Sequence, residues 1–487
     1  MNLIPNSGKT FPSWRAISLQ RKSLASWLPL AISERKLLLV LLDSLALAGA
    51  LWLGLWVGFG HMPRWSDFPS FLVWLVILLA LWHALGRAWD AYDLKTAGHL
   101  GLSSRRVFAV GIFALVAYLL IPFLHPATLW EWPSAGIFIS SALGFLLAGR
   151  TLYVVGVWQP VFERRCLIVG AGRSGTEMAR ILRDHDRSGY RVIGFVDDDT
   201  RKRNQVIEGS PVLGDRRDLL ALVQQHHIST IILAITHRLE TGLFQVLMDS
   251  LELGVQIIPM IELYEQLTGR VPIEHIGDNW YVAMPLDHPA TRPLFGLAKR
   301  LLDIILASIG LLGLGLALPF IALAIYFDSP GPIFYTQERV GKGGKTFRIY
   351  KFRTMIPDAE RAGQAVWAQD HDPRVTRVGR LLRATHVDEF PQFLNILKGE
   401  MSAVGPRPER PEFAAELERE IPFYRTRHAV RPGMAGWGLV KQGYGSSKED
   451  ALIKLQYDLY YIKHQSLYFD LAILLQTFID VFTLGGR

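Results

Sequence analysis

The chain has 487 residues, half of them hydrophobic and 20% charged, with a formal net charge of +8. This length allows about three domains, and the hydrophobic share is high for a soluble protein with so many charges. Cys166 is the only cysteine, which excludes an intrachain disulfide and a cysteine-based zinc site. The positive charge suits an anionic membrane surface or phosphorylated substrates, and we expect no nucleic-acid partner.

Residues 1–160 predict a transmembrane domain with four helices. Apolar segments fall near Leu37–Gly60, Phe71–Trp89, Val107–Leu124 and Ala135–Trp158, and Arg150 interrupts the fourth. Lys and Arg gather before the first segment, between the second and third, and after the fourth, whereas the other two loops contain only Arg64. By the positive-inside rule, both ends of this domain face the cytoplasm.

Residues 161–293 alternate predicted strands and helices, which indicates a doubly wound, Rossmann-like α/β domain. An apolar strand runs into Gly170, Gly172 and Gly175, and a helical pattern follows. The next strand ends at Asp197, about where a dinucleotide-binding fold places its ribose-binding carboxylate. The glycines would let a phosphate approach a helix N-terminus, but they equally suit a tight strand-to-helix turn. A bound nucleotide therefore stays an open prediction.

An apolar helix at about residues 297–328 begins the last domain. Its segment Ile304–Phe327 is long enough to cross a bilayer. A crossing, however, would separate the nucleotide-type domain before it from the phosphate-handling domain after it. Pro319 removes one backbone donor and should kink the helix. We therefore expect a re-entrant helix that returns to the same face, with a plain transmembrane span as the alternative.

Residues 294–487 predict an α+β catalytic domain with dense positive charge. Asp388 and Glu389 lie amid this charge and are followed by Pro391. Surrounding cations should favour the ionised carboxylates, which can attack phosphorus or hold a divalent cation. The alternative is an acidic pair that merely decorates a helix. The cations suited to clamping a diphosphate are Lys342, Lys345, Arg348, Lys351, Arg353, Arg374, Arg377, Arg380 and Arg407.

The order of motifs in this domain resembles the bacterial sugar transferase family, whose members are monotopic phosphoglycosyl transferases. The matching strings, in order, are KRLLD, DSPGPIFY, KFRTM, DPRVTRVGRLLR, VDEFPQ, LKGEMSAVGPRP, RPGMAGWGLV and KLQYDLYYIKHQSLYFDL. Four upstream spans and a CoA-binding-like α/β domain resemble the large members, such as undecaprenyl-phosphate galactose or glucose phosphotransferases. The membrane domain matches in layout rather than by motif.

The resemblance implies an activity and roles for residues. Asp388 would attack the sugar-bearing phosphate of a UDP-sugar and release UMP, and undecaprenyl phosphate would then take the phosphosugar from the aspartate. Glu389 would bind Mg²⁺, with Mn²⁺ as an alternative. Further substrate-binding residues would be Lys351, Arg353, Arg380, Arg407 and Asp470. The resemblance also implies a homodimer in the bacterial inner membrane that begins exopolysaccharide, capsule or O-antigen synthesis.

Two departures and two other classes of function remain. Leu318-Pro319 stands where the family often has Ser-Pro at the helix break. The stretch around Trp437, Lys441 and Gln442 also differs from the family's usual sequence, and we expect these residues to bear on sugar choice. An oxidoreductase is one alternative, because the α/β domain also resembles the leading domain of nucleotide-sugar dehydratases, although no Tyr-x-x-x-Lys pair is visible in the tyrosine-rich tail. A non-catalytic scaffold is the other, and the intact acidic pair argues against it.

Overall fold

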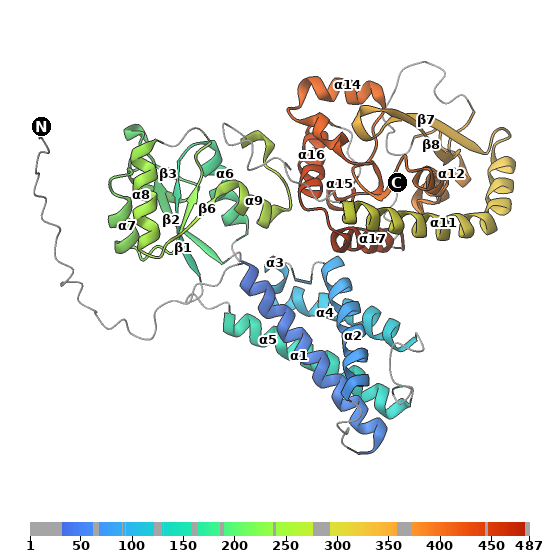
Figure 1. Cartoon of the computed structure of the whole chain (residues 1–487), viewed down its shortest axis with the longest axis horizontal. Helices are drawn as coiled ribbons and strands as arrows, with labels where there is room; N and C mark the ends of the chain where they lie inside the picture. Colours follow the sequence, from blue (N-terminus) through green and yellow to red (C-terminus); the bar gives the residue numbers. More distant parts are fainter. Residues whose placement is uncertain are drawn as a thin grey trace, which may run out of the picture.

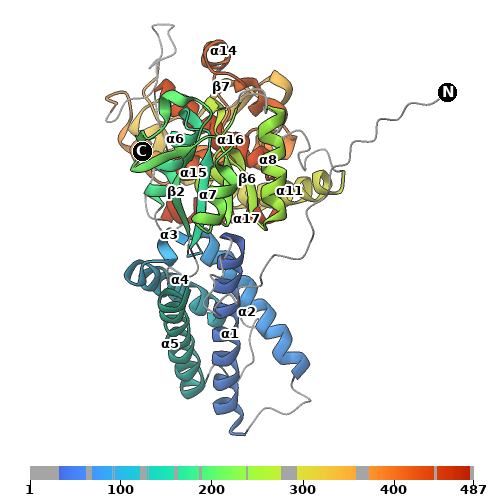
Figure 2. The same ribbon diagram turned by 90° about the vertical axis from the view of Figure 1, so that its left-hand side faces the viewer.

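The structure is a computed structural model of the whole chain. It describes residues 32–61, 68–89, 91–92, 94–120, 129, 131–157, 163–185, 189–236, 240–275, 293–357, 372–443 and 447–482. Arg64, the predicted boundary at residues 160 and 161, and the predicted segment ends at Leu124 and Trp158 lie outside these residues. Figures 1 and 2 show a helical bundle below an α/β part and a C-terminal part.

Four of the described bundle helices lie at the predicted apolar segments, and one short helix, Leu94–Ala97, lies between the second and third. Among the described residues, five helices are long and apolar enough to cross a membrane, namely α1, α2, α4 and α5 of the bundle and α11 of the C-terminal part. A helix suits such segments because it satisfies its own backbone hydrogen bonds where lipid offers no partners. The bundle helices are α1 (Ile32–Phe59), α2 (Phe68–Ala88), α3 (Leu94–Ala97), α4 (Leu100–Leu120) and α5 (Trp132–Val157).

Arg150, which interrupts the fourth apolar segment, has a buried partner on α1. Its Nη2 lies 2.7 Å from Oδ2 of Asp43, and both side chains are at most 1% exposed. Trp82 and Tyr92 donate to the same oxygen at 3.1 and 2.9 Å. Asp43, Trp82 and Arg150 lie on α1, α2 and α5, so this cluster links the three helices. Removing one member of a buried ion pair typically costs about 3–5 kcal/mol of folding stability.

The α/β part is a doubly wound sheet in the strand order β3-β4-β2-β1-β5-β6. Its pairs are parallel except β3 with β4, and Cys166 is buried in β1 as the apolar strand predicts. The elements are β1 (Arg164–Val169), α6 (Arg173–Asp184), β2 (Tyr190–Val196), η4 (Thr200–Lys202), β3 (Val206–Ile207), β4 (Ser210–Gly214), α7 (Leu219–Gln225), β5 (Thr230–Leu233), α8 (Thr241–Glu252), β6 (Gln256–Pro259), α9 (Met260–Thr268) and η5 (Ile273–His275).

The C-terminal part is helical and carries two small sheets, an antiparallel β7–β8 hairpin and a parallel β9–β10 pair. Its elements are α11 (Pro293–Asp328), β7 (Phe334–Val340), η7 (Lys342–Gly344), β8 (Thr346–Phe352), α12 (Arg377–Ala384), η8 (Val387–Gln392), α13 (Phe393–Lys398), β9 (Ser402–Val404), α14 (Pro411–Glu420), η9 (Tyr424–Ala429), β10 (Gly433–Ala435), α15 (Trp437–Gln442), α16 (Lys448–Lys463) and α17 (Leu467–Phe482).

Helix α11 contains Pro319 and runs along the lower edge of the C-terminal part before it changes direction toward β7 (Figure 1). Near its start, Asp303 accepts hydrogen bonds from Ser402 Oγ at 2.9 Å and the Ala403 amide at 2.8 Å. At its end, Asp328 accepts from the Val378 amide at 2.8 Å. Both ends of α11 are therefore bonded to the same folded part.

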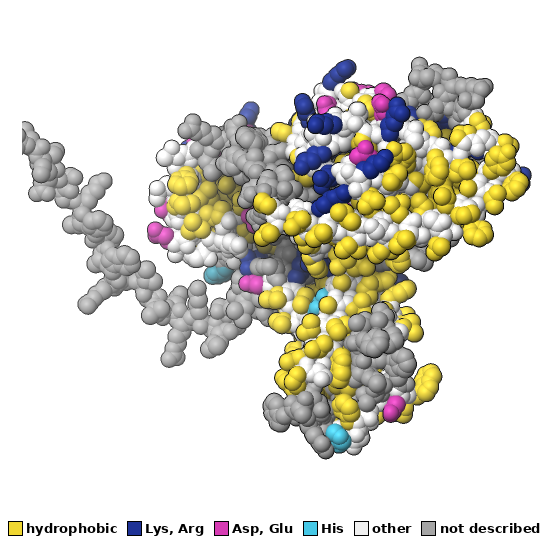
Figure 3. Space-filling view, turned by 45° about the vertical axis from the view of Figure 1, so that its right-hand side comes forward, with side chains coloured by type: hydrophobic (Ala, Val, Ile, Leu, Met, Phe, Trp, Pro, Cys, Tyr) yellow, Lys and Arg dark blue, Asp and Glu magenta, His cyan; other side chains and the backbone are white. Residues whose placement is uncertain are grey.

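The outer face of α11 is apolar along its whole length. Its exposed side chains recur every three or four residues, which places them on one side of the helix. Figure 3 shows hydrophobic side chains along this lower edge, with Lys and Arg gathered above them. The exposed residues include Leu297, Leu301, Ile305, Leu312, Leu316, Phe320, Leu323 and Phe327.

The α/β and C-terminal parts meet where α9 approaches α15 and α16. Glu265 is 4% exposed, and its carboxylate lies 2.8 Å from Lys463 Nζ and 3.1 Å from His464 Nε2. Trp437 donates its indole N–H to the carbonyl of Gly269 at 3.0 Å. The Trp437 indole N–H thus bonds to the α/β part, whereas the sequence suggested that this residue bears on sugar choice.

Candidate active site

Asp388 and Glu389 lie on the short 3₁₀ helix η8, which packs against β8, α12 and α13. The chain enters η8 through His386, whose φ is +55°. This left-handed conformation is uncommon for a residue other than glycine, and such residues concentrate at functional sites. Pro391 lies inside η8, as the sequence indicates.

Two cations hold the Glu389 carboxylate. Lys351 Nζ and Arg407 Nη2 both lie 2.6 Å from its Oε1, and Arg407 Nη1 lies 3.3 Å from its Oε2. Burial opposes ionisation of Glu389, but Arg407 and Lys351 outweigh it and hold its pKa below the usual value. Lys351 and Arg407, which were predicted to bind the diphosphate, thus contact Glu389, and their role in substrate binding stays a prediction.

Asp388 is 8% exposed and accepts no hydrogen bond from any other residue that the structure describes. Burial raises its pKa to about 6, the Glu389 carboxylate adds to this increase, and Lys351, Arg383 and Arg407 reduce it. The expected lowering of the pKa by nearby cations is thus the net result for Glu389, whereas the net pKa shift of Asp388 is upward although its cations lower it. The physical reason is that desolvation of Asp388, which accepts no hydrogen bond from a described residue, outweighs the attraction of the cations.

Three other predicted substrate-binding residues have different surroundings. Arg353 donates to the carbonyls of Ser329 and Pro330, where α11 ends. Asp470 is fully buried and accepts from Lys299 and Tyr461, both at 2.7 Å. In the described part of the chain, no hydrogen bond or ion pair joins Arg353, Arg380 or Asp470 to the acidic pair, and the side chain of Arg380 is exposed on α12.

Arg383 is a residue of this site that the sequence reasoning missed. It lies one turn after Arg380 on α12, its Nε donates to Thr354 Oγ1 at 2.9 Å, and it acts electrostatically on Asp388. A signal was available, because Gly379 and Leu382 form the buried side of α12. The helical spacing therefore places Arg383 rather than Arg380 next to the inward face.

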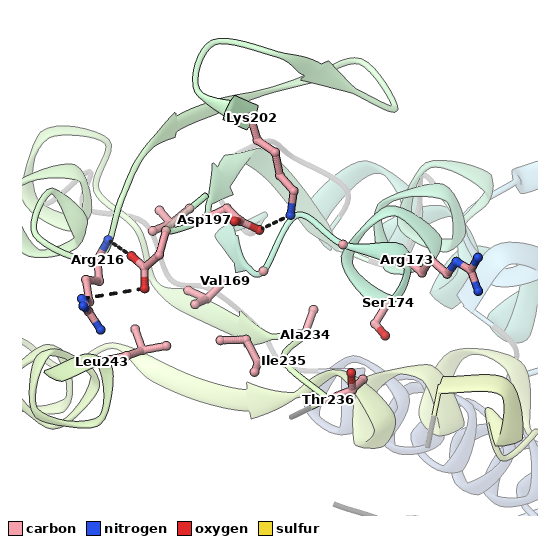
Figure 4. Close-up of a pocket in the computed structure, with 14 residues that line it drawn as sticks. Val169, Arg173, Ser174, Asp197, Lys202, Arg216, Ala234, Ile235, Thr236 and Leu243 are labelled. Carbon is pink, nitrogen blue, oxygen red and sulfur yellow. Dashed lines mark hydrogen bonds and ion pairs between the residues drawn. The ribbon is translucent and has the colours of Figure 1, made fainter. Parts of the chain in front are cut away.

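The glycine turn of the α/β part borders a separate cavity of about 250 Å³ at the carboxyl ends of β1, β2 and β5 (Figure 4). Asp197 lines it, but its carboxylate already accepts from the Ala171 amide at 2.7 Å, Lys202 Nζ at 2.9 Å and the Asp199 amide at 2.9 Å. Burial opposes ionisation of Asp197, yet Lys202 and the two amides lower its pKa. Asp197 therefore stabilises the turn after β1 through these three hydrogen bonds.

The glycines themselves serve close packing. A Cβ on Gly175 would lie 1.9 Å from the Gly170 carbonyl oxygen, and Gly170 has a φ of +106°. Gly172 caps α6 without a side-chain hydrogen bond. The close approach at Gly175 and the positive φ of Gly170 are typical of a tight strand-to-helix turn. Nucleotide binding at Gly170, Gly172, Gly175 and Asp197 stays a prediction.

The donor set near Asp388 can accommodate Mg²⁺. Among the hydrogen bonds between described residues, Oε2 of Glu389 accepts the 3.3 Å contact from Arg407 and no other, so it keeps acceptor capacity. Mg²⁺ usually keeps several waters and uses one or two carboxylates together with substrate phosphates. In the described ranges no three His, Cys, Asp or Glu side chains gather as a metal cluster, so Glu389 with a bound diphosphate is the fitting arrangement.

Together, the apolar helices and the acidic pair clamped by cations define a membrane-associated protein with a site suited to phosphate chemistry. A family model described as "Bacterial sugar transferase" matches residues 295–484, and one described as "CoA-binding domain" matches residues 87–260. A Xanthomonas campestris pv. campestris relative named UDP-glucose:undecaprenyl-phosphate glucose-1-phosphate transferase is 30% identical, over 76% of this chain and 78% of its own length. The chain belongs to the bacterial sugar transferase family.

Two further relatives show how the likeness is distributed. An Aeromonas hydrophila protein named UDP-N-acetylgalactosamine-undecaprenyl-phosphate N-acetylgalactosaminephosphotransferase is 45% identical over 46% of this chain, and the match spans 52% of its own length. The chain thus aligns with about half of that relative. A Rhizobium leguminosarum bv. phaseoli relative named exopolysaccharide production protein PSS is 40% identical over 38% of this chain but 96% of its own length.

Proposed function

We propose that this protein transfers a hexose-1-phosphate from a UDP-hexose to undecaprenyl phosphate, as the first membrane step in the synthesis of a bacterial surface polysaccharide. The observation that carries the proposal is the contrast within the acidic pair. Asp388 accepts no hydrogen bond from a described residue and titrates near 6, while Lys351 and Arg407 hold Glu389 ionised. Asp388 is thus largely ionised at neutral pH and is available as a nucleophile.

The proposed reaction has two steps. In the first, an Asp388 carboxylate oxygen bonds to the sugar-bearing phosphorus, the bond from this phosphorus to the bridging oxygen breaks, and UMP leaves. In the second, a phosphate oxygen of undecaprenyl phosphate bonds to the same phosphorus and displaces the aspartate. Asp388 is regenerated and undecaprenyl-diphospho-hexose is released, so no oxidant or reductant is needed.

The other residues of the site would supply charge and position. Arg383 and Arg407 would face the diphosphate, since both act on the Asp388 carboxylate that attacks it. Lys351 and Arg407 would keep Glu389 in place. Mg²⁺ held by Glu389 and the diphosphate would neutralise phosphate charge. Positioning and charge stabilisation account for most of the catalysis in phosphoryl transfer.

The arrangement of α11 supports a monotopic, re-entrant attachment to the cytoplasmic side of the inner membrane. A helix with both ends bonded to one folded part cannot place those ends on opposite sides of a bilayer unless that part also crosses. The exposed apolar face would enter one leaflet and hold the site near the lipid phosphates.

The activity is tested by incubating the purified protein with Mg²⁺ and a panel of UDP-glucose, UDP-galactose and their N-acetylated forms. Without a lipid acceptor, one donor should give a stoichiometric burst of UMP and a protein whose mass has increased by the phosphate of that donor's sugar. Adding undecaprenyl phosphate should discharge this adduct and begin turnover. No UMP from any donor, with or without the lipid, would overturn the proposal.

The membrane arrangement is tested by cysteine labelling in intact cells. Single cysteines at Arg300 and Ser329, in a background without Cys166, should both resist an impermeant thiol reagent and should both react after lysis. Labelling at Ser329 from outside the cell would show that α11 crosses the membrane.

A further inference from the structure

Arg407 belongs to a loop between β9 and α14 whose backbone is fixed on several sides. The Gly405 amide donates to the Ala435 carbonyl, and the Gly433 amide donates to the Pro406 carbonyl, both at 2.9 Å. The Val340 amide donates to the Glu409 carbonyl at 2.9 Å. These bonds hold the loop before and after Arg407, and one more contact fixes the carbonyl of Arg407 itself.

That contact comes from Arg427 on η9, a buried residue that touches neither carboxylate of the acidic pair. Its Nη2 donates to the Arg407 carbonyl at 2.9 Å and to Asp458 Oδ2 at 2.9 Å, and its Nη1 donates to the Tyr424 hydroxyl at 2.5 Å. Arg427 is 7% exposed, and Asp458, on α16, is 3% exposed.

The geometry suits a guanidinium and no other side chain. One planar group serves a carboxylate, a hydroxyl and a backbone carbonyl at fixed angles, whereas the ammonium of a lysine is a single point on a flexible stem. Asp458 compensates the buried charge of Arg427, which would otherwise be costly. The pair therefore fixes where the backbone of Arg407 lies, and hence where its side chain begins.

We propose that Arg427, held by Asp458, is a positioning residue for Arg407 and through it for Glu389 and the donor diphosphate. As far as the diphosphate is concerned, this inference rests on the proposed function. The connection runs from Asp458 to Arg427, from Arg427 to the Arg407 carbonyl, and from the Arg407 guanidinium to the Glu389 carboxylate at 2.6 Å.

The test is a double-mutant cycle in the full-length protein with its donor and acceptor. Arg427→Lys should lower kcat/KM for the UDP-hexose about tenfold, a loss that corresponds to one displaced charge contact. Arg407→Ala keeps the carbonyl but removes the side chain that is being positioned. In that background, Arg427→Lys should cost less than about twofold more, because coupled residues are not additive.

The separation of kcat from KM is a second readout that a purely structural role would not move. A loss of folded protein lowers kcat alone, whereas displacement of Arg407, which contacts Glu389 and would face the donor diphosphate, should also raise KM for the UDP-hexose. Arg300→Lys is the matched control, because Arg300 also donates to backbone carbonyls in this part, those of Ile396 and Leu397, and no hydrogen bond joins it to Arg407 among the described residues. It should leave both kcat and KM unchanged.

Asp458→Asn is the milder second variant if Arg427→Lys folds poorly, and its loss of activity should also vanish in the Arg407→Ala background. An equal loss in both backgrounds, or an unchanged KM in Arg427→Lys, would overturn the positioning role while leaving the proposed function intact. Absence of turnover by the unmodified protein would instead be a failure of the proposed function.

Discussion

Asp388 and Asp197 are both partly or fully buried carboxylates close to a lysine, one in the C-terminal part and the other at the α/β cavity. The carboxylate of Asp197 receives three hydrogen bonds from its own domain, and its pKa is lowered. Asp388 receives none from a described residue, and burial raises its pKa to about 6. A satisfied carboxylate stabilises a turn, whereas a desolvated and unbonded one retains its reactivity.

The largest expected difference between the two carboxylates appears when the charge of each is removed in turn. Asp388→Asn should lower turnover by at least about 10³-fold and abolish the phosphosugar adduct, because an amide is not a nucleophile toward phosphorus. Asp197→Asn should keep turnover within about threefold and lower the unfolding temperature, because Lys202 loses its partner. Steady-state UMP release, intact-protein mass and thermal unfolding check both variants. Near-normal turnover by Asp388→Asn would refute its assignment as nucleophile.

Chelation of Mg²⁺ should affect the site of Asp388 and Glu389 and leave the α/β part unchanged. Excess EDTA should reduce turnover about 100-fold or more, because a bound cation contributes several kcal/mol of charge stabilisation. Mg²⁺ should restore the activity, and Mn²⁺ should substitute for it. Thermal unfolding of the α/β part should not change, because Asp197 is bonded to Lys202 and to backbone amides. Full turnover in excess chelator would contradict a role for Mg²⁺ at Glu389.

The pH dependence of kcat/KM should reflect the titration of Asp388 and not that of Asp197. Only the ionised carboxylate attacks, and burial raises the pKa of Asp388 to about 6. The value of kcat/KM should therefore be constant above about pH 7 and fall about tenfold per unit below pH 6. Asp197→Asn should show the same profile as the unmodified protein. A limb near pH 4 would show that Asp388 titrates like an exposed aspartate.

The smallest effect on chemistry is expected from deleting the part that contains Asp197. A remnant starting at Leu294 should form the phosphosugar adduct within about threefold of the normal rate, because the acidic pair and its cations all follow this residue. Its stability should fall, since Glu265 and the Gly269 carbonyl no longer bond to Lys463 and Trp437. A folded remnant that binds donor but forms no adduct would place the α/β part in the catalytic machinery.

Several features were predictable because they depend on local pattern. Long apolar runs predicted the helices of the bundle and α11, and apolar strands followed by glycines predicted the β1-to-α6 turn. The resemblance assigned Lys351 and Arg407 to the diphosphate, and only the structure showed that both contact Glu389. Arg383, one helical turn after Arg380, is the arginine that acts on Asp388, and substrate binding by Arg380 stays a prediction.

By itself, the sequence determined the family, the membrane character and the identity of the acidic pair, because these depend on residue type and order. Tertiary structure alone decided which groups contact one another. It placed Arg353 at the end of α11, buried Asp470 with Lys299 and Tyr461, and bonded Arg427 to the Arg407 carbonyl. It also separated the pKa values of Asp388 and Glu389, because desolvation and hydrogen bonding depend on packing between segments far apart in the chain.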